Sequence, residues 1–238
     1  MNATVLSFSG VAKDYGGARV LDSVDLEVGA GECVALVGVN GAGKTSLLRC
    51  LLDFTRPSAG RIEICGIDHR DSAARTPLGY LPERFAPPYY LTGRDFLRYM
   101  LRLHQLPYDE PAALELLSQL ELEPPVLDKR ARQLSKGMAQ KLGLAACLLA
   151  DKQLYILDEP SSGLDPKARA LLRAQFARLR ERGRTVFFTS HALADVEELC
   201  DRVAILDRGR LLFTGTPSNC RERYDAGSLE QAFLRCIH

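Results

Sequence analysis

The stretch from Gly38 to Thr45 has the residue types and spacing of a phosphate-binding loop. It satisfies the pattern G-x-x-x-x-G-K-[ST] between an apolar run and a helical pattern. Glycines let backbone N–H groups converge on an anion, and the following helix adds the positive end of its dipole. Lys44 can reach the β and γ phosphates of a nucleotide, and the Thr45 hydroxyl can ligate Mg²⁺. The predicted nucleotide contacts are Gly38, Val39, Asn40, Gly41, Ala42, Gly43, Lys44, Thr45 and Ser46.

Two adjacent carboxylates, Asp158 and Glu159, follow the apolar run from Leu154 to Leu157. Carboxylates at the end of a buried strand can hold a metal ion and accept a proton from water. We expect Asp158 to bind Mg²⁺ and Glu159 to polarise the attacking water. With Lys44, these residues predict hydrolysis of a nucleoside triphosphate with Mg²⁺.

The remaining motifs resemble those of the ATP-binding cassette (ABC) ATPases, in type and in order, over nearly the whole chain. Leu134 to Met138 resembles the signature sequence LSGGQ, and Ser161 to Pro166 resembles the D-loop. Thr189 to His191 resembles the segment that carries the switch histidine, and Tyr15 resembles the aromatic residue that stacks on adenine. The resemblance makes Glu159, His191 and Lys44 the catalytic candidates.

The signature segment is also a physically reasonable anion site. Ser135 precedes an apolar helical pattern, where a hydroxyl, free N–H groups and the helix dipole can face a phosphate. Taken alone, Ser135 would be an ordinary helix cap. The resemblance implies instead that Ser135 and Gly137 contact the γ-phosphate of ATP held by a second copy of the chain.

Two departures from the family pattern point to one of its branches. Glu83 stands after the Leu78 to Leu81 strand where the family has glutamine, and Lys136 and Met138 replace the usual signature residues. Glu83 remains a predicted metal ligand beside Thr45 and Asp158. These variations resemble the ABC-2-type branch, which contains exporters.

The pattern of apolar residues predicts an α/β fold with a mostly parallel sheet. Cys33 to Val37 is a continuous apolar run, typical of a strand covered on both faces, and alternating strands and helices follow Ala150. From Thr92 to Ala150 the pattern is helical. We predict one domain with an antiparallel N-terminal β part: a P-loop NTPase (RecA-like) core at 1–83 and 151–238, with an inserted helical lobe at 84–150.

Composition agrees with a single packed domain. The 238 residues are 46% hydrophobic and 26% charged, and the formal charge of +1 gives no reason to expect nucleic-acid binding. Seven cysteines without a C-x-x-C pair indicate reduced thiols. His69, His104 and His238 match no motif and are expected at the surface. Neither a leader peptide nor a membrane-spanning run is apparent.

The sequence therefore predicts an ATP-hydrolysing subunit that powers a separate membrane permease. Its expected partners are a second copy of itself, in an ATP-sandwich dimer, and the permease, which would hold it on the cytoplasmic face of the membrane. One alternative is an ABC ATPase that acts on ribosomes or DNA. Another is a regulatory scaffold that binds ATP without hydrolysing it.

Overall fold

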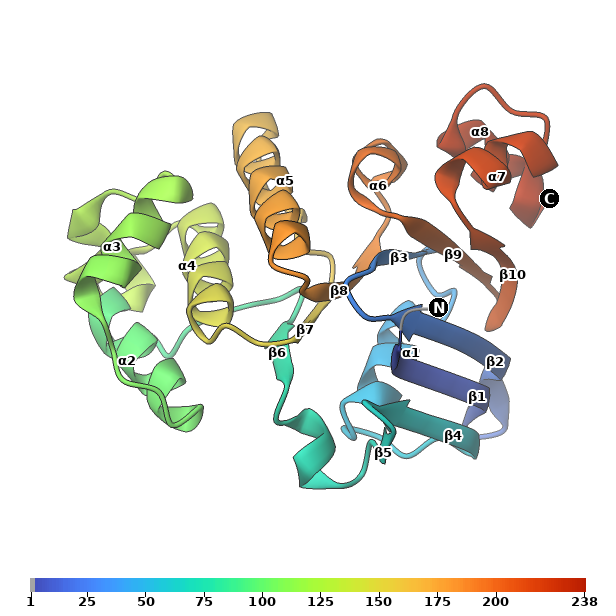
Figure 1. The fold of residues 1–238 in the computed structure, drawn as a ribbon, viewed down its shortest axis with the longest axis horizontal. Coiled ribbons are helices and arrows are strands. Elements are labelled where there is room, and N and C mark those ends of the chain that lie inside the picture. The colour runs from blue at the N-terminus through green and yellow to red at the C-terminus, as the bar shows by residue number, and fades with distance from the viewer. Residues whose placement is uncertain (1–2) are drawn as a thin grey trace.

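The computed structural model describes residues 3–238, so Met1 and Asn2 of the predicted 1–83 segment lie outside the described residues. Two β-sheets lie beside each other, with helices around them (Figure 1). The strands are β1 (Thr4–Tyr15), β2 (Ala18–Gly29), β3 (Cys33–Val37), β4 (Ala59–Ile64), β5 (Ile67–Asp68), β6 (Leu78–Leu81), β7 (Leu154–Leu157), β8 (Thr185–Ser190), β9 (Arg202–Asp207) and β10 (Arg210–Gly215). The helices are α1 (Lys44–Leu51), α2 (Gly93–Leu103), α3 (Glu110–Gln119), α4 (Lys136–Leu149), α5 (Pro166–Glu181), α6 (Leu193–Leu199), α7 (Pro217–Arg223) and α8 (Leu229–Ile237).

The larger sheet has six strands in the order β10-β9-β3-β8-β7-β6. Its five strands from β9 to β6 pair in parallel, and β10 pairs antiparallel to β9 as a terminal hairpin. Every residue of β3, β7 and β8 is buried, because helices or the second sheet cover both faces. The predicted α/β fold with a mostly parallel sheet is confirmed.

Alternate residues of the parallel strands enter two separate hydrophobic clusters. Tyr155, Leu157 and Phe188 pack in the cluster that includes α4 and α5. Ile156 and Phe187 pack in the other cluster, with α1 and the N-terminal strands. A residue's position in the strand thus decides which face of the sheet it occupies.

The smaller sheet is antiparallel, with the order β2-β1-β4-β5. It packs on the α1 side of the larger sheet through the second cluster, where Leu6, Phe8 and Ile62 meet Leu48 of α1. The predicted antiparallel N-terminal part is therefore present.

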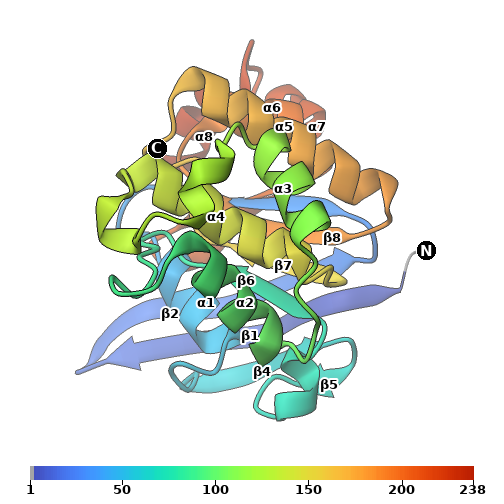
Figure 2. The same cartoon turned by 90° about the vertical axis from the view of Figure 1, so that its left-hand side faces the viewer.

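The helices α2, α3 and α4 gather at one end of the molecule, as Figures 1 and 2 both show. Thr92 caps α2, because its hydroxyl accepts a hydrogen bond from the Asp95 backbone N–H at 3.1 Å. Leu103 follows Phe96 and Met100 at helical spacing, yet it is 60% exposed, whereas Phe96 and Leu97 are buried.

Three features differ from or add to the sequence prediction. His69 is buried, not at the surface, and its Nδ1 lies 3.1 Å from the carbonyl oxygen of Ile62. The helices α7 and α8 close the fold beyond the β9-β10 hairpin and were not predicted. Within residues 3–238, none of the helices combines the length and apolar character that crossing a bilayer requires.

Candidate nucleotide-binding site

The predicted phosphate-binding loop joins the buried strand β3 to α1, and two of its glycines are sterically required. A side chain on Gly38 would collide with the carbonyl oxygen of Leu206. Gly43 has a φ of 114°, and a Cβ there would lie 2.9 Å from the carbonyl oxygen of Val20. The backbones of β9 and β2 therefore leave no room for a side chain at these two positions of the loop.

Lys44 is buried at the start of α1 with its ammonium group turned into the loop. Its Nζ donates a hydrogen bond to the carbonyl oxygen of Gly38 at 2.6 Å and lies 3.8 Å from Glu159 Oε1. Burial lowers the pKa of Lys44, and the charges of Glu159, Asp158 and Glu83 only partly oppose this effect. The site thus holds a poorly solvated cation that an anionic ligand would stabilise.

Asp158 continues β7 on the face of the sheet that α1 covers. It follows the alternation of Leu154 and Ile156, and β8 places Thr189 beside it on the same face, in step with Phe187. The Thr189 hydroxyl donates to Asp158 Oδ1 at 2.6 Å. Burial raises the pKa of Asp158, although the hydrogen bond from Thr189 lowers it.

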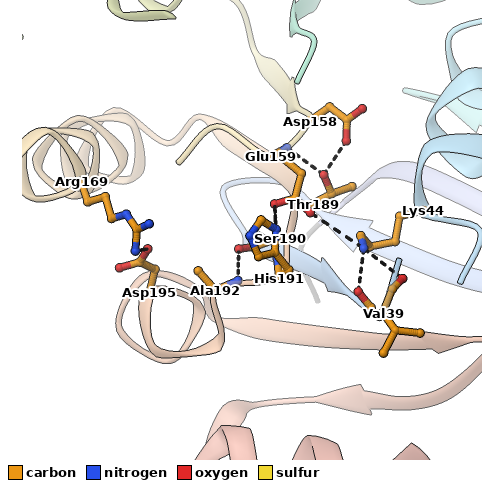
Figure 3. Close-up of polar contacts among 11 residues, drawn as sticks. Val39, Lys44, Asp158, Glu159, Arg169, Thr189, Ser190, His191, Ala192 and Asp195 are labelled. Atoms are coloured by element: carbon orange, nitrogen blue, oxygen red, sulfur yellow. Dashed lines mark hydrogen bonds and ion pairs between the residues drawn. The ribbon is translucent and has the colours of Figure 1, made fainter. Parts of the chain in front are cut away.

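Glu159 leaves the strand alternation, because its backbone has a φ of 48°. Its carboxylate is therefore directed toward β8 and the loop after it, where His191 lies (Figure 3). His191 Nδ1 lies 2.7 Å from Glu159 Oε2, and the His191 backbone N–H donates to the same oxygen at 3.3 Å. When Glu159 is ionised, Nδ1–H is the donor, so the histidine orients a buried carboxylate.

These groups surround a cavity of about 310 Å³. Lys44, Asp158, Glu159 and the predicted metal ligand Glu83 meet there, although they come from three separate parts of the sequence. The lining residues are Val20, Val39, Asn40, Gly41, Ala42, Gly43, Lys44, Thr45, Ser46, Glu83, Asp158, Glu159 and His191. A lysine, backbone N–H groups and carboxylates in one cavity are suited to a phosphorylated ligand and a divalent cation.

Comparison with known proteins agrees with this geometry. The family model described as "ABC transporter" matches residues 21–162, which is more than half of the chain. The chain belongs to the ABC transporter family of ATP-binding proteins. A solved structure described as an ATP binding subunit of an ABC transporter is 31% identical, with a TM-score of 0.89, and the match covers 98% of this chain and 99% of that one.

Curated relatives of this ABC protein are longer than the chain. An uncharacterised ABC transporter ATP-binding protein of Synechocystis is 42% identical over 82% of this chain, and the chain spans 56% of its length. A Nod factor export ATP-binding protein I of Rhizobium meliloti is 37% identical over 90% of this chain, which spans 65% of its length. The chain therefore carries the ATPase domain of the family.

Gly38 begins the loop but does not line the cavity. Tyr15, Ser135 and Gly137, the predicted nucleotide contacts of this ABC domain outside the loop, do not line it either. Tyr15 ends β1 and is 42% exposed, with Lys13 Nζ 4.7 Å from its ring centroid. Ser135 caps α4, accepting a hydrogen bond from the Met138 backbone N–H at 3.2 Å, and is exposed. Gly137 faces open space, since a Cβ there would meet no atom within 4 Å.

Two residues near the cavity were missed by sequence reasoning. Val20 lines the cavity from β2, and the Thr189 hydroxyl donates to the Asp158 carboxylate and accepts from the Glu159 backbone N–H. Thr189 lies in the run Val186 to Ser190, and a β-branched residue is common in any strand, so its presence there indicates no special role. Only the sheet order, which places β8 beside β7, could have revealed its contacts.

Proposed function

We propose that the chain hydrolyses ATP in this cavity and that the hydrolysis drives export through a separate membrane permease. The observation that carries this proposal is the position of Glu159. Its buried carboxylate lies between Lys44 at 3.8 Å and His191 at 2.7 Å, beside the phosphate-binding loop. A carboxylate held in this way can accept a proton from water while the lysine attracts the phosphates.

The cavity also fits Mg²⁺. Its candidate ligands, the Asp158 carboxylate and the Thr45 hydroxyl, are hard oxygen donors, and Asp158 is a buried carboxylate that a cation would stabilise. Glu83 is exposed at the rim and could add a third oxygen. Mg²⁺, when bound with ATP, would neutralise charge that develops on the phosphate oxygens.

Each of these site residues then has a separate role. Lys44 exchanges its bonds to the loop carbonyls for phosphate oxygens, and the loop N–H groups hold the remaining charge. Glu159 takes the proton from the attacking water, and His191 keeps the carboxylate directed at it. Tyr15, which is exposed at the end of β1, would stack on the adenine outside the phosphate cavity.

We propose that two copies of the chain complete the site. Ser135 and Gly137 lie outside the cavity of their own chain and are accessible, which supports a role at the γ-phosphate of a partner copy. An arrangement with two-fold symmetry would place each α4 start opposite a phosphate-binding loop.

The export and membrane parts of the proposal rest on relatives. Several curated relatives are named Nod factor export ATP-binding protein I, and Glu83 with the Ser-Lys-Gly-Met signature resembles the same exporter branch. A surface near Glu83 and the helical lobe, with Tyr89 and Tyr90 70% and 63% exposed, would contact the permease on the cytoplasmic face of the membrane.

Phosphate release by the purified chain with ATP and Mg²⁺ tests the catalytic proposal. Lys44→Ala should weaken ATP binding, because the lysine contacts the phosphates in the ground state. ATP binding without phosphate release would instead favour a regulatory scaffold. For the membrane proposal, the chain should remain in the supernatant after ultracentrifugation when expressed by itself and should pellet with membranes when its permease is present.

Light scattering with ATP, with ADP and without nucleotide tests the shared site. A Glu159→Gln variant that keeps its ATP should accumulate as a dimer only with ATP. Adding Ser135→Arg should abolish that dimer, because the arginine side chain would place bulk and a positive charge in the interface. A dimer present equally in all three conditions, or one unaffected by Ser135→Arg, would contradict the two-copy site.

A further inference from the structure

We infer that Thr189 is a positioning residue for both metal binding and hydrolysis, a role that rests on the proposed function. Thr189 is the fifth residue of β8 and none of its surface is exposed. Its hydroxyl donates to the carboxylate of Asp158 at 2.6 Å and accepts from the backbone N–H of Glu159 at 2.8 Å (Figure 3). One hydroxyl therefore contacts the predicted metal ligand and the predicted general base at once.

The bond to Asp158 fixes the direction of the carboxylate. Asp158 is 5% exposed, so water does not compete freely for its oxygens. With Oδ1 engaged by Thr189, Oδ2 is the oxygen that remains for a cation in the cavity, which Thr45 also lines. Groups that orient a metal ligand in this way commonly change metal affinity or activity about 10- to 100-fold when they are removed.

The bond to Glu159 holds a backbone conformation that a glutamate rarely adopts. Glu159 has a φ of 48°, in the left-handed region, and its buried N–H would lack this partner if the hydroxyl were absent. The left-handed backbone is what turns the Glu159 carboxylate away from the strand alternation and toward His191. Thr189 therefore acts on Glu159 through the backbone.

Sheet order explains why a residue of β8 has this reach. β8 lies between β3, which leads into the phosphate-binding loop, and β7, which leads into the carboxylates. Leu36 is paired with Thr189, and Leu157 is paired with Phe188, one residue earlier. Thr189 thus lies near the carboxyl end of β8, close to where β3 ends before the loop and where β7 ends before the carboxylates.

Three variants separate positioning from general stability. Thr189→Val keeps the shape of the side chain and removes the hydroxyl, whereas Thr189→Ser keeps the hydroxyl. Thr185→Val is the matched control, since Thr185 is also buried on β8 and its hydroxyl accepts from the Gly31 backbone N–H at 2.9 Å, at the opposite end of the strand. Melting temperatures would show whether both valine variants remain folded.

The first readout is the affinity of the ADP-loaded chain for Mn²⁺, which replaces Mg²⁺ and is measured by electron paramagnetic resonance. Thr189→Val should weaken Mn²⁺ binding by about tenfold or more, with ADP affinity in EDTA unchanged. The second readout is ATP hydrolysis, where kcat should fall about 10- to 100-fold with a smaller change in KM. Thr189→Ser should restore both quantities, and Thr185→Val should alter neither.

Wild-type Mn²⁺ affinity and kcat in Thr189→Val would overturn the inference. Equal losses in Thr189→Val and Thr185→Val would overturn it too, because they would show a general effect of removing a buried hydroxyl. These outcomes differ from failure of the proposed function. In that case the unmutated chain would itself bind no Mn²⁺ with nucleotide or release no phosphate from ATP.

Discussion

Replacing Glu159 with glutamine should separate ATP binding from ATP hydrolysis. Glutamine keeps the size of the side chain and one oxygen for His191, whose Nδ1 lies 2.7 Å from the carboxylate. It removes the basic oxygen that would accept the proton from water. A general base contributes on the order of 10²- to 10⁴-fold to a rate. At ~1.36 kcal/mol for each tenfold change, the barrier should rise by about 3 to 5 kcal/mol.

Binding should survive the same change for a geometric reason. Lys44 is held by the carbonyl oxygens of Gly38 and Val39 at 2.6 and 3.4 Å, and neither bond involves Glu159. The loop and its N–H groups are likewise untouched. Removing a negative charge beside the phosphates also lessens repulsion, so ATP affinity should stay equal or increase.

Single-turnover phosphate release and fluorescent ATP binding would measure the two effects separately. Glu198→Gln is a suitable control, because Glu198 lies on α6 after His191, is exposed and pairs with Arg173 at 3.3 Å. It should retain the full rate. Hydrolysis by Glu159→Gln at the unmutated rate would remove Glu159 from the mechanism, and loss of ATP binding would show that it serves the ground state instead.

Three further predictions concern stability and reactivity. Burial lowers the pKa of Lys44. The Lys44 ammonium group therefore loses its proton at a lower pH in the folded chain than in the unfolded chain, where its pKa is about 10.4. Lys44 therefore contributes stability that increases with pH between its two pKa values, so the urea stability of the nucleotide-free chain should change more favourably with pH than that of Lys44→Met; equal slopes in the two proteins would contradict this. Among the free cysteines Cys65 is the exposed one, so Ellman's reagent should label it first and Cys65→Ser should remove the fast phase. Rapid labelling of Cys147, whose pKa burial raises to about 12, would count against this packing. Gly143→Ala should destabilise the lobe by about 1 to 2 kcal/mol, because its Cβ would lie 2.6 Å from the Phe85 ring. Gly137→Ala, which meets nothing, should not lower the melting temperature.

The sequence was sufficient where chemistry is encoded in neighbouring residues. The phosphate-binding loop, the Asp158-Glu159 pair and the start of α4 at Ser135 each depend on a short segment, and their positions in the fold agree with the prediction. The fold class also follows, since continuous apolar strands that alternate with helices have few other arrangements.

Features that depend on strand order were beyond reach of the sequence. Nothing in the run Val186 to Ser190 indicates that β8 lies between β3 and β7, so the contacts of Thr189 could not be predicted. The burial of His69 has a similar origin, because its backbone N–H and its Nδ1 both contact the carbonyl oxygen of Ile62 on β4, a contact that depends on the β4–β5 pairing. The helix α8 was different: Ser228 and the apolar residues Leu229, Ala232 and Phe233 form a readable cap and helical repeat.

The central position of β3 has a consequence for the order in which a growing chain can fold. Both hydrogen-bonding neighbours of β3, namely β8 and β9, begin at Thr185 and Arg202, long after β3 ends at Val37. The small sheet needs only residues up to Asp68 and can pair as soon as they leave the ribosome.

Until β8 and β9 arrive, β3 would keep two unpaired edges on an entirely apolar strand. Such edges favour pairing with other chains during synthesis. A chain arrested after α4 would therefore hold β3 and the loop after it without the two strands that pair with β3. The strand that is fully buried in the finished protein is therefore open to other chains until β8 and β9 have been made.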